Sequence, residues 1–311
     1  MGNLGASAHG LYAEDVQRMA KNDLAAPGPD AVVATGKFIG DLDEGFAIAL
    51  YRPRNATGPL PAVVFLPGRV APESQYESYA RALASRGFVV AVRGWYSPME
   101  SDRELAADAR RIAHWLVAER LADPARIGAA GHSMGAKDAI LAALEEDSLF
   151  HAVVAIDPDD NGRNSVAHGA IAKLKPALLL VGAEVAWKAS SVCAPLANNY
   201  ERFFENAPAG TAKLTLREAD HVQVMDDPNG FGYGICRCGK ADSRVVRNLA
   251  RRATVQFFVE KLQGIALPAV AMGADGLYTV KSNDKLAAND KLAQATASAA
   301  RPARVTRATT R

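Results

Sequence analysis

The motif Gly131-His132-Ser133-Met134-Gly135 carries the strongest structural signal in this chain, because it has the pattern G-x-S-x-G. A short apolar segment typical of a buried strand precedes it, and an alanine- and leucine-rich segment typical of a helix follows it. A serine at such a junction lies in a sharp turn, with its hydroxyl exposed beside the helix N-terminus. The two glycines fit this turn, since a side chain at either position would collide with a neighbouring strand or helix. The context therefore favours a nucleophilic serine over an ordinary glycine–serine turn.

The segments on both sides of this motif alternate between strand and helix patterns. Near-continuous apolar strands separated by helices predict an α/β fold with a mostly parallel central sheet and helices on both faces. Active sites of such sheets lie beyond the carboxyl ends of the strands, which is where Ser133 falls. We expect strands at residues 46–51, 62–66, 88–92, 127–130, 151–156, 177–181 and 213–216, and helices at 76–86, 102–121, 136–144 and 244–262.

The composition is that of an ordinary globular protein, with 49% hydrophobic and 23% charged residues in a chain of 311. A net charge of +2 gives no reason to expect a nucleic-acid or anionic-membrane partner. The sequence shows no apolar run long enough for a transmembrane segment. We expect an N-terminal extension at 1–40, one catalytic domain at 41–265 and a low-complexity, flexible tail at 266–311, where Asn-Asp-Lys-Leu-Ala occurs at 283–287 and again at 289–293.

A serine nucleophile needs an imidazole that takes its proton and a carboxylate that orients the imidazole. In this type of fold these partners follow the serine in the order acid, then histidine. Three histidines follow Ser133. His221 lies in the last loop before the final helix and is the expected base, whereas His151 comes too early and His168 is a weaker alternative in a polar loop.

The acid and the oxyanion hole are predicted from the ends of strands. Asp157 and Glu184 each follow a strand and compete for the position of the acid on geometry alone. Asp159 and Asp160, in the same loop as Asp157, are expected to be solvated. Two backbone N–H groups should stabilise the oxyanion, one from Met134 after the nucleophile and one from Arg69 in the loop after an early strand.

The sequence resembles the chlorophyllase family over roughly residues 45–265, with the motifs in order. The resemblance rests on Ser-Met-Gly-Ala-Lys at 133–137, Ala-Ile-Asp-Pro at 155–158, Cys-Ala-Pro at 193–195, the segment 199–204, Asp-His at 220–221 with Met-Asp-Asp at 225–227, and Gly-Ile-Cys-Arg-Cys at 234–238. It implies an α/β-hydrolase fold, cleavage of the phytyl ester of chlorophyll, Asp157 as the acid and His221 as the base. The chain has Pro67, Met134 and Asp220 where plant members carry histidine, arginine and glycine. Around the serine it is equally similar to cutinase-like polyester hydrolases, which usually carry the acid one strand later, where this chain has Glu184.

The three cysteines and three aromatic residues are further candidates for the site. Cys236 and Cys238 are too close in sequence to pair easily, but either could form a disulfide with Cys193, and three free thiols are equally expected. A disulfide would indicate an oxidising compartment and export, whereas free thiols would indicate the cytoplasm. A structural metal site is not expected, since a fourth ligand is missing. The aromatic residues that follow strand ends and could line the substrate site are Trp95, Tyr96 and Trp187.

Together these features predict a serine carboxylic-ester hydrolase that works through an acyl-enzyme and needs no cofactor. The expected partner is a small or lipophilic ester, and the oligomeric state is left open. The alternatives are a broad-specificity esterase, a cutinase-like polyester hydrolase and, more distantly, a non-catalytic binding module of the same fold.

Overall fold

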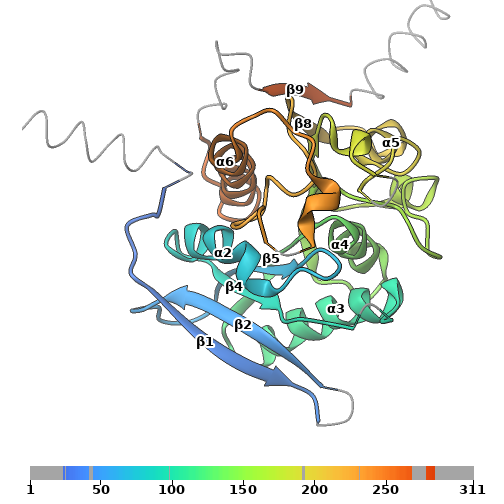
Figure 1. The fold of residues 1–311 in the computed structure, drawn as a ribbon. Helices are drawn as coiled ribbons and strands as arrows, with labels where there is room; N and C mark the ends of the chain where they lie inside the picture. Colours follow the sequence, from blue (N-terminus) through green and yellow to red (C-terminus); the bar gives the residue numbers. More distant parts are fainter. Residues whose placement is uncertain are drawn as a thin grey trace, which may run out of the picture.

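A computed structural model describes residues 24, 26–41, 45–97, 99–190, 193–230, 232–267 and 278–283 of the chain. Strands in these residues form one nine-stranded sheet in the order β1-β2-β4-β3-β5-β6-β7-β8-β9 (Figure 1). The six strands from β4 to β8 in this order are parallel to their neighbours, and β1, β2 and β9 pair antiparallel. The strands are β1 (Val32–Ile39), β2 (Phe46–Pro53), β3 (Leu60–Leu66), β4 (Val89–Arg93), β5 (Ala122–His132), β6 (Phe150–Ile156), β7 (Ala177–Ala183), β8 (Ala212–Leu216) and β9 (Tyr278–Ser282). The predicted mostly parallel α/β sheet is confirmed.

Helices cover the sheet on both faces, as the continuous apolar strands require. One buried apolar cluster joins the sheet to α2 (Glu77–Ala84) and α6 (Ser243–Leu262). A second cluster, on the other face, joins it to α3 (Asp102–Ala118), α4 (Met134–Leu144) and α5 (Tyr200–Asn206). The close approach of α6 depends on Gly128 in β5, where an added Cβ would lie 2.5 Å from the ring of Phe258. The two layers of helices hold the central strands rigidly, so their carboxyl ends provide a fixed platform.

The sheet extends beyond the range expected for the catalytic domain at both ends of the chain. Strand β1 lies within residues 1–40, and β9 lies within residues 266–311. Strand β9 pairs along its full length with β8, and the side chain of Asn283 donates hydrogen bonds to the carbonyls of Phe204 and Ala207. Backbone pairing therefore extends the sheet into segments that were expected to lie outside the catalytic domain. Apart from Asn283, both Asn-Asp-Lys-Leu-Ala repeats lie outside the described residues.

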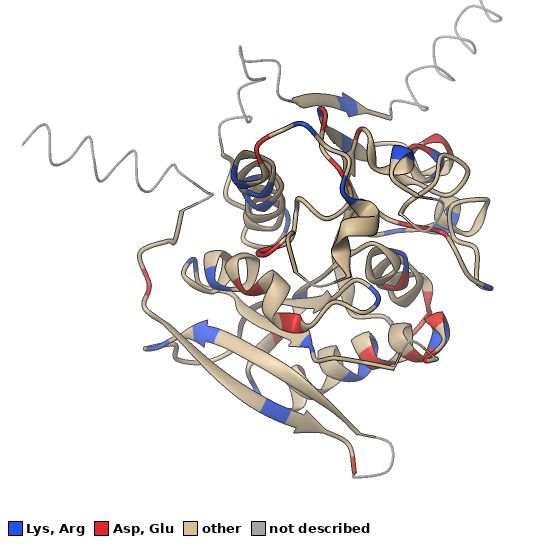
Figure 2. Ribbon diagram, viewed as in Figure 1, with Lys and Arg blue, Asp and Glu red and all other residues tan. Residues whose placement is uncertain are grey.

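Charged residues of both signs are interspersed along the helices, strands and loops (Figure 2). Within the described ranges, no helix combines the length and apolar character needed to cross a membrane.

Candidate active site

Ser133 lies in the turn between β5 and α4, with backbone angles φ 58° and ψ −129°. A non-glycine residue rarely adopts a positive φ, so the surrounding structure must hold this conformation. The turn is tight on both sides. A Cβ on Gly131 would overlap the carbonyl oxygen of Gly135, and a Cβ on Gly135 would overlap the carbonyl oxygen of Pro67. The glycines therefore let the end of β3 and the start of α4 close around the serine.

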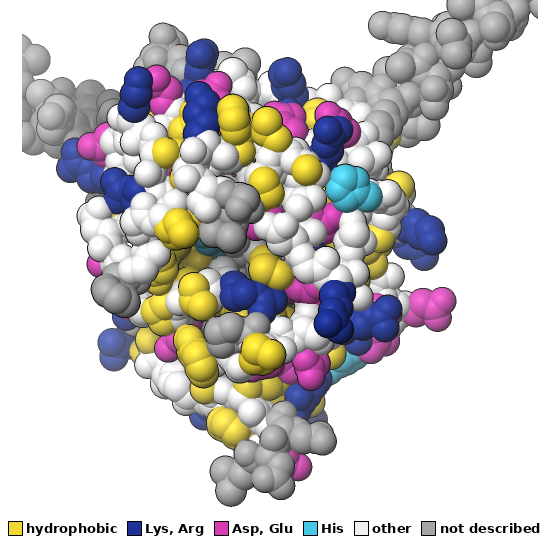
Figure 3. Space-filling model, turned by 45° about the vertical axis from the view of Figure 1, so that its right-hand side comes forward, with side chains coloured by type: hydrophobic (Ala, Val, Ile, Leu, Met, Phe, Trp, Pro, Cys, Tyr) yellow, Lys and Arg dark blue, Asp and Glu magenta, His cyan; other side chains and the backbone are white. Residues whose placement is uncertain are grey.

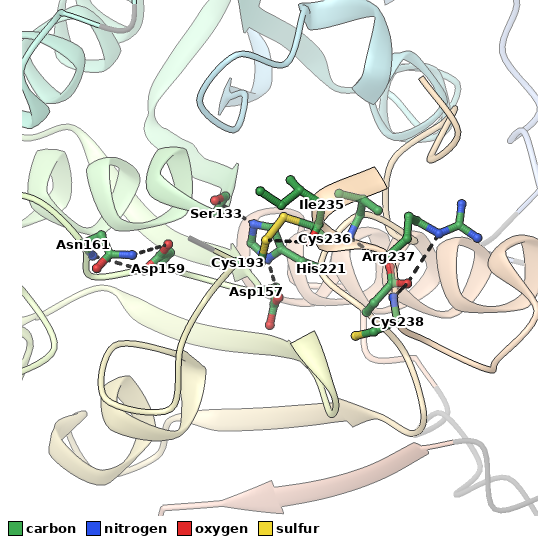
Figure 4. Close-up of a disulfide and its surroundings, with 12 residues drawn as sticks. Ser133, Asp157, Asp159, Asn161, Cys193, His221, Ile235, Cys236, Arg237 and Cys238 are labelled. Carbon is green, nitrogen blue, oxygen red and sulfur yellow. Dashed lines mark hydrogen bonds and ion pairs between the residues drawn. A yellow bond between two sulfur atoms is a disulfide. The ribbon is translucent and has the colours of Figure 1, made fainter. Parts of the chain in front are cut away.

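Ser133, His221 and Asp157 form a continuous chain of hydrogen bonds (Figure 4). Ser133 Oγ lies 2.8 Å from His221 Nε2, and His221 Nδ1 lies 2.6 Å from Asp157 Oδ2. All three side chains are buried, and that of Asp157 is fully inaccessible to solvent. A carboxylate on Nδ1 places the proton there, which leaves Nε2 as the acceptor that faces the serine hydroxyl.

Asp157 reaches His221 from the end of β6 by turning across the neighbouring strand β7. Its backbone has φ 40°, and its carboxylate Oδ1 accepts a hydrogen bond of 2.9 Å from the amide of Ala183. The competing acid Glu184 instead accepts a hydrogen bond from the amide of Glu218. Of the two acids that the sequence left open, the structure brings Asp157 to the histidine. His151 and His168 lie exposed on the surface.

The environment of His221 favours the protonated imidazole. Burial alone lowers the pKa of this side chain, but the hydrogen bond and charge of Asp157 outweigh it, and the charges of Asp159 and Asp220 act in the same direction. The pKa of His221 is therefore raised above its ordinary value. Such a histidine can accept a proton from a neighbouring hydroxyl and remain stabilised as an imidazolium.

The two residues expected to supply the oxyanion hole, Met134 and Arg69, are in side-chain contact. Met134 is the first residue of α4, and the amides of a helix's first turn have no carbonyl partner within the helix. Arg69 lies in the loop after β3, and its Nε is 3.1 Å from Met134 Sδ. Arg69, Met134 and Ser133 all border the same cavity. The positive end of the helix dipole adds to the preference for negative charge at this point.

An open cavity of about 470 Å³ lies over Ser133 and His221. Apolar side chains make up most of its wall, and its polar residues come from several segments, among them the loop after β3 and the β6–β7 connection. The face turned forward in Figure 3 carries apolar side chains interspersed with charged ones. Lining residues include Val70, Val222, Met225, Tyr233 and Ile235 on the apolar side and Arg69, Asp159 and Asn161 on the polar side. The cavity is suited to a lipophilic molecule that carries a polar group near the serine.

A disulfide joins Cys193 to Cys236 at the edge of this cavity (Figure 4). Cys236 ends the 3₁₀ helix η4 (Tyr233–Cys236), which forms one wall of the cavity. Cys238 is a free thiol whose Sγ lies 3.1 Å from the carbonyl oxygen of Val185. The disulfide between Cys193 and Cys236 links η4, and with it this wall of the cavity, to the segment after β7.

Asp220, which precedes the histidine, is a buried carboxylate with several partners. It accepts hydrogen bonds from the amides of Cys238 and Gly239 through one oxygen and of Val222 and Gln223 through the other. These contacts hold the His221 loop against the segment after η4. Apart from its difference from the plant pattern, no feature of the sequence singles out this residue.

The three aromatic residues expected near the substrate do not border the cavity. Trp95 is exposed, and its carbonyl is held by the guanidinium of Arg93. Tyr96 is buried behind the site, with its hydroxyl donating to the carbonyl of Pro67. Trp187 borders a separate hollow near β8 and β9. Among the described residues, Tyr233 contributes an aromatic ring to the cavity, from η4 in a Gly-rich segment without a strand or helix pattern.

Across the described part of the chain, no cluster of three or more histidine, cysteine, aspartate or glutamate side chains is arranged to hold a metal ion.

The family model for chlorophyllase matches residues 46–275, which is most of the chain. The matched range contains Ser133, Asp157, His221 and both cysteines of the disulfide. A search of the curated proteins found no match.

Proposed function

The chain belongs to the chlorophyllase family, and on this basis we propose that it is a serine hydrolase that cleaves a carboxylic ester through an acyl-enzyme. One observation carries the proposal. Ser133 Oγ, the His221 ring and the Asp157 carboxylate are linked by hydrogen bonds of 2.8 and 2.6 Å at the floor of an apolar cavity. Such an arrangement activates a serine hydroxyl, which is a weak nucleophile on its own.

In the proposed first half-reaction, Ser133 Oγ attacks the ester carbonyl carbon while His221 Nε2 takes the hydroxyl proton. Asp157 keeps the imidazole oriented and stabilises the imidazolium. The carbonyl oxygen becomes an oxyanion and accepts hydrogen bonds from the amides of Met134 and Arg69. When the tetrahedral intermediate collapses, the bond to the leaving oxygen breaks, and His221 donates its proton to the departing alcohol.

In the second half-reaction, water replaces the alcohol. His221 Nε2 takes a proton from the water as its oxygen attacks the acyl carbon, and a second oxyanion forms in the same place. Collapse of this intermediate breaks the bond to Ser133 Oγ, which regains its proton from His221. The carboxylic acid leaves, and the free enzyme is restored without a cofactor in any step.

The proposed substrate is a lipophilic ester, with the phytyl ester of chlorophyll as the first candidate because of the family. The apolar wall formed by Val70, Val222, Met225 and Ile235 supports a long or bulky hydrocarbon group. The disulfide supports function in an oxidising compartment, since cysteines are kept reduced in most cytosolic proteins.

The test uses purified wild-type protein and its Ser133→Ala variant with chlorophyll, a short nitrophenyl ester and a fluorescent phosphonate probe. We expect serine-dependent hydrolysis and serine-dependent labelling. His221→Ala should be inactive, whereas His168→Ala, which changes an exposed histidine, should keep wild-type rates. Cleavage of the short ester or a polyester film without chlorophyllide release would keep the mechanism and reject the chlorophyll substrate. Labelling that persists in Ser133→Ala would reject the assignment of the nucleophile.

A further inference from the structure

A buried hydrogen-bonded bridge runs behind Ser133 and connects two loops that are distant in sequence. The amide of Gly68 donates to Tyr76 Oη at 3.0 Å, and Tyr76 Oη lies 2.8 Å from His132 Nδ1. His132 Nε2 lies 2.9 Å from the main-chain carbonyl oxygen of His221. Tyr76 and His132 are almost completely buried. We call these four groups the Tyr76–His132 bridge.

The direction of each hydrogen bond in the bridge follows from its ends. A carbonyl oxygen can only accept, so His132 Nε2 must carry the proton that it donates to His221. In a neutral imidazole Nδ1 is then an acceptor, and Tyr76 must donate its hydroxyl proton to it. The tyrosine oxygen in turn accepts from Gly68. Every group is satisfied in one arrangement only, so the bridge fixes the tautomer of His132.

Electrostatics agree with this arrangement. Burial, followed by the neighbouring His221, holds the pKa of His132 well below its ordinary range, and burial raises the pKa of Tyr76 well above its own. The ring of His132 lies against the ring of His221, with 4.7 Å between centroids. A neutral His132 therefore presents no positive charge when His221 becomes an imidazolium.

Each end of the bridge holds a loop that the proposed reaction uses. Gly68 directly precedes Arg69, and its amide is committed to Tyr76, so the proposed oxyanion donor from this loop is the next amide. An added Cβ on Gly68 would lie 3.0 Å from His132 Nδ1, 3.2 Å from Tyr76 Oη and 3.3 Å from Ser133 Cβ. The glycine thus allows the loop, the bridge and the serine to pack in direct contact. At the other end, His132 holds the backbone of the residue proposed as base.

We propose that Tyr76 and His132 are positioning residues that hold the oxyanion loop and the base at fixed distances from Ser133. The inference rests on the proposed function, because it assigns these residues a role in that reaction. Tyr76 lies outside the cavity lining, and His132 borders the cavity with a side chain that is only 2% exposed, so we assign both residues an action through Gly68 and the His221 backbone. Loss of the bridge should therefore weaken binding of the transition state far more than binding of the substrate.

The test compares Tyr76→Phe with Tyr79→Phe. Tyr79 is a second fully buried tyrosine, one turn further on, whose hydroxyl donates at 2.8 Å to the carbonyl of Val224. Each variant removes one buried hydroxyl. Tyr76→Phe leaves the Gly68 amide and His132 Nδ1 without this partner, and Tyr79→Phe leaves the Val224 carbonyl without it, so both variants should lose stability. Only Tyr76→Phe breaks the bridge. We expect its kcat on a soluble nitrophenyl ester to fall by about 10- to 100-fold, below the 100- to 1000-fold typical of losing an oxyanion donor outright.

The separate effects on kcat and KM distinguish a positioning role from a loss of folded protein. In Tyr76→Phe, KM should stay within about twofold, and affinity for a boronate that mimics the tetrahedral intermediate should fall in step with kcat/KM. Tyr79→Phe should keep both kcat and boronate affinity. Equal kcat in the two variants, or a change confined to KM, would overturn the inference.

A second pair of variants tests the inference if Tyr76→Phe does not fold. His132→Gln keeps one donor and one acceptor, so it should retain more activity than the similarly sized His132→Leu. Equal activity in that pair would also overturn the inference. If the wild-type protein itself shows no serine-dependent hydrolysis, the proposed function fails and not the bridge alone.

Discussion

Comparing alanine with glycine at position 133 measures the backbone strain stored at the proposed nucleophile. Ser133→Ala and Ser133→Gly both remove the hydroxyl and its hydrogen bond to His221, so this loss is common to both. Alanine keeps a Cβ at φ 58°, whereas glycine adopts this conformation without steric cost. The difference in stability between the two variants therefore contains the strain.

The size of the strain follows from a second comparison in the same segment. Ala130, three residues earlier in β5, is fully buried and has ordinary strand geometry. Ala→Gly at 130 should destabilise the protein, because glycine loses about 0.5–1 kcal/mol more backbone entropy and a buried methyl worth roughly 0.8 kcal/mol disappears. At 133 the same two losses apply, but relief of strain of about 1–3 kcal/mol opposes them. The difference between the stability changes for Ala→Gly at 130 and at 133 is therefore the strain energy at position 133.

The measurement is urea unfolding at equilibrium without reductant on four proteins: wild type, Ala130→Gly, Ser133→Ala and Ser133→Gly. We expect Ala→Gly to be less destabilising at 133 than at 130 by about 1–3 kcal/mol, with unchanged dependence on urea. Both variants at 133 should be inactive. Equal penalties at the two positions would refute the conclusion that the fold holds the serine under strain.

Three further predictions concern the surroundings of the serine. Gly135→Ala should push away the Pro67 carbonyl and with it the loop proposed to supply an oxyanion donor. This lowers kcat by roughly 100-fold or more and the free energy of unfolding by about 1–3 kcal/mol, and normal kinetics in this variant would contradict the packing argument. Asp159→Asn removes a charge that raises the pKa of His221, so that pKa should fall and the acid limb of kcat/KM against pH should move to lower pH, whereas a move to higher pH would reverse the assigned sign. Reducing the disulfide, whose cysteines are 43 residues apart, should lower the free energy of unfolding by about 2–4 kcal/mol. The number of titratable thiols should rise from one to three at the same time. An unchanged urea midpoint would show that the crosslink adds no stability.

The residues with local signals could be predicted from the sequence. The turn at Ser133 is defined by a strand, two glycines and a helix within a short segment, and the structure places it as expected. His221 stood out because the order of partners along such a chain leaves one late loop for it. Asp157 and Glu184 could not be separated by residue pattern, because both end neighbouring strands. What separates them is the positive φ of Asp157 and its hydrogen bond to the Ala183 amide, which exist only in the folded chain.

The features that the sequence did not predict depend on contacts between distant segments. Tyr76 and His132 are 56 residues apart, and His132 and His221 are 89 apart, so the bridge leaves no periodic pattern in the sequence. The aromatic residues after strand ends were expected to face the substrate, but the carbonyl of Trp95 is bound by Arg93, whose guanidinium is itself held by Asp108 on α3. Strand β9 forms only because β8 offers a free edge to pair with.

The wall formed by η4 gives this protein a way to change its substrate without changing its chemistry. Tyr233 and Ile235 face the cavity from a short helix held in place by a covalent bond, and Ile235 is 60% exposed. Substitutions of Ile235 remove little buried surface, so the protein can tolerate many of them, whereas Tyr233 is half-buried and packs partly against the core. A library randomised at position 235, with the disulfide kept, is therefore a direct route to new ester preferences. The same freedom gives natural selection a place to diversify relatives of this enzyme while the serine, histidine and aspartate stay fixed.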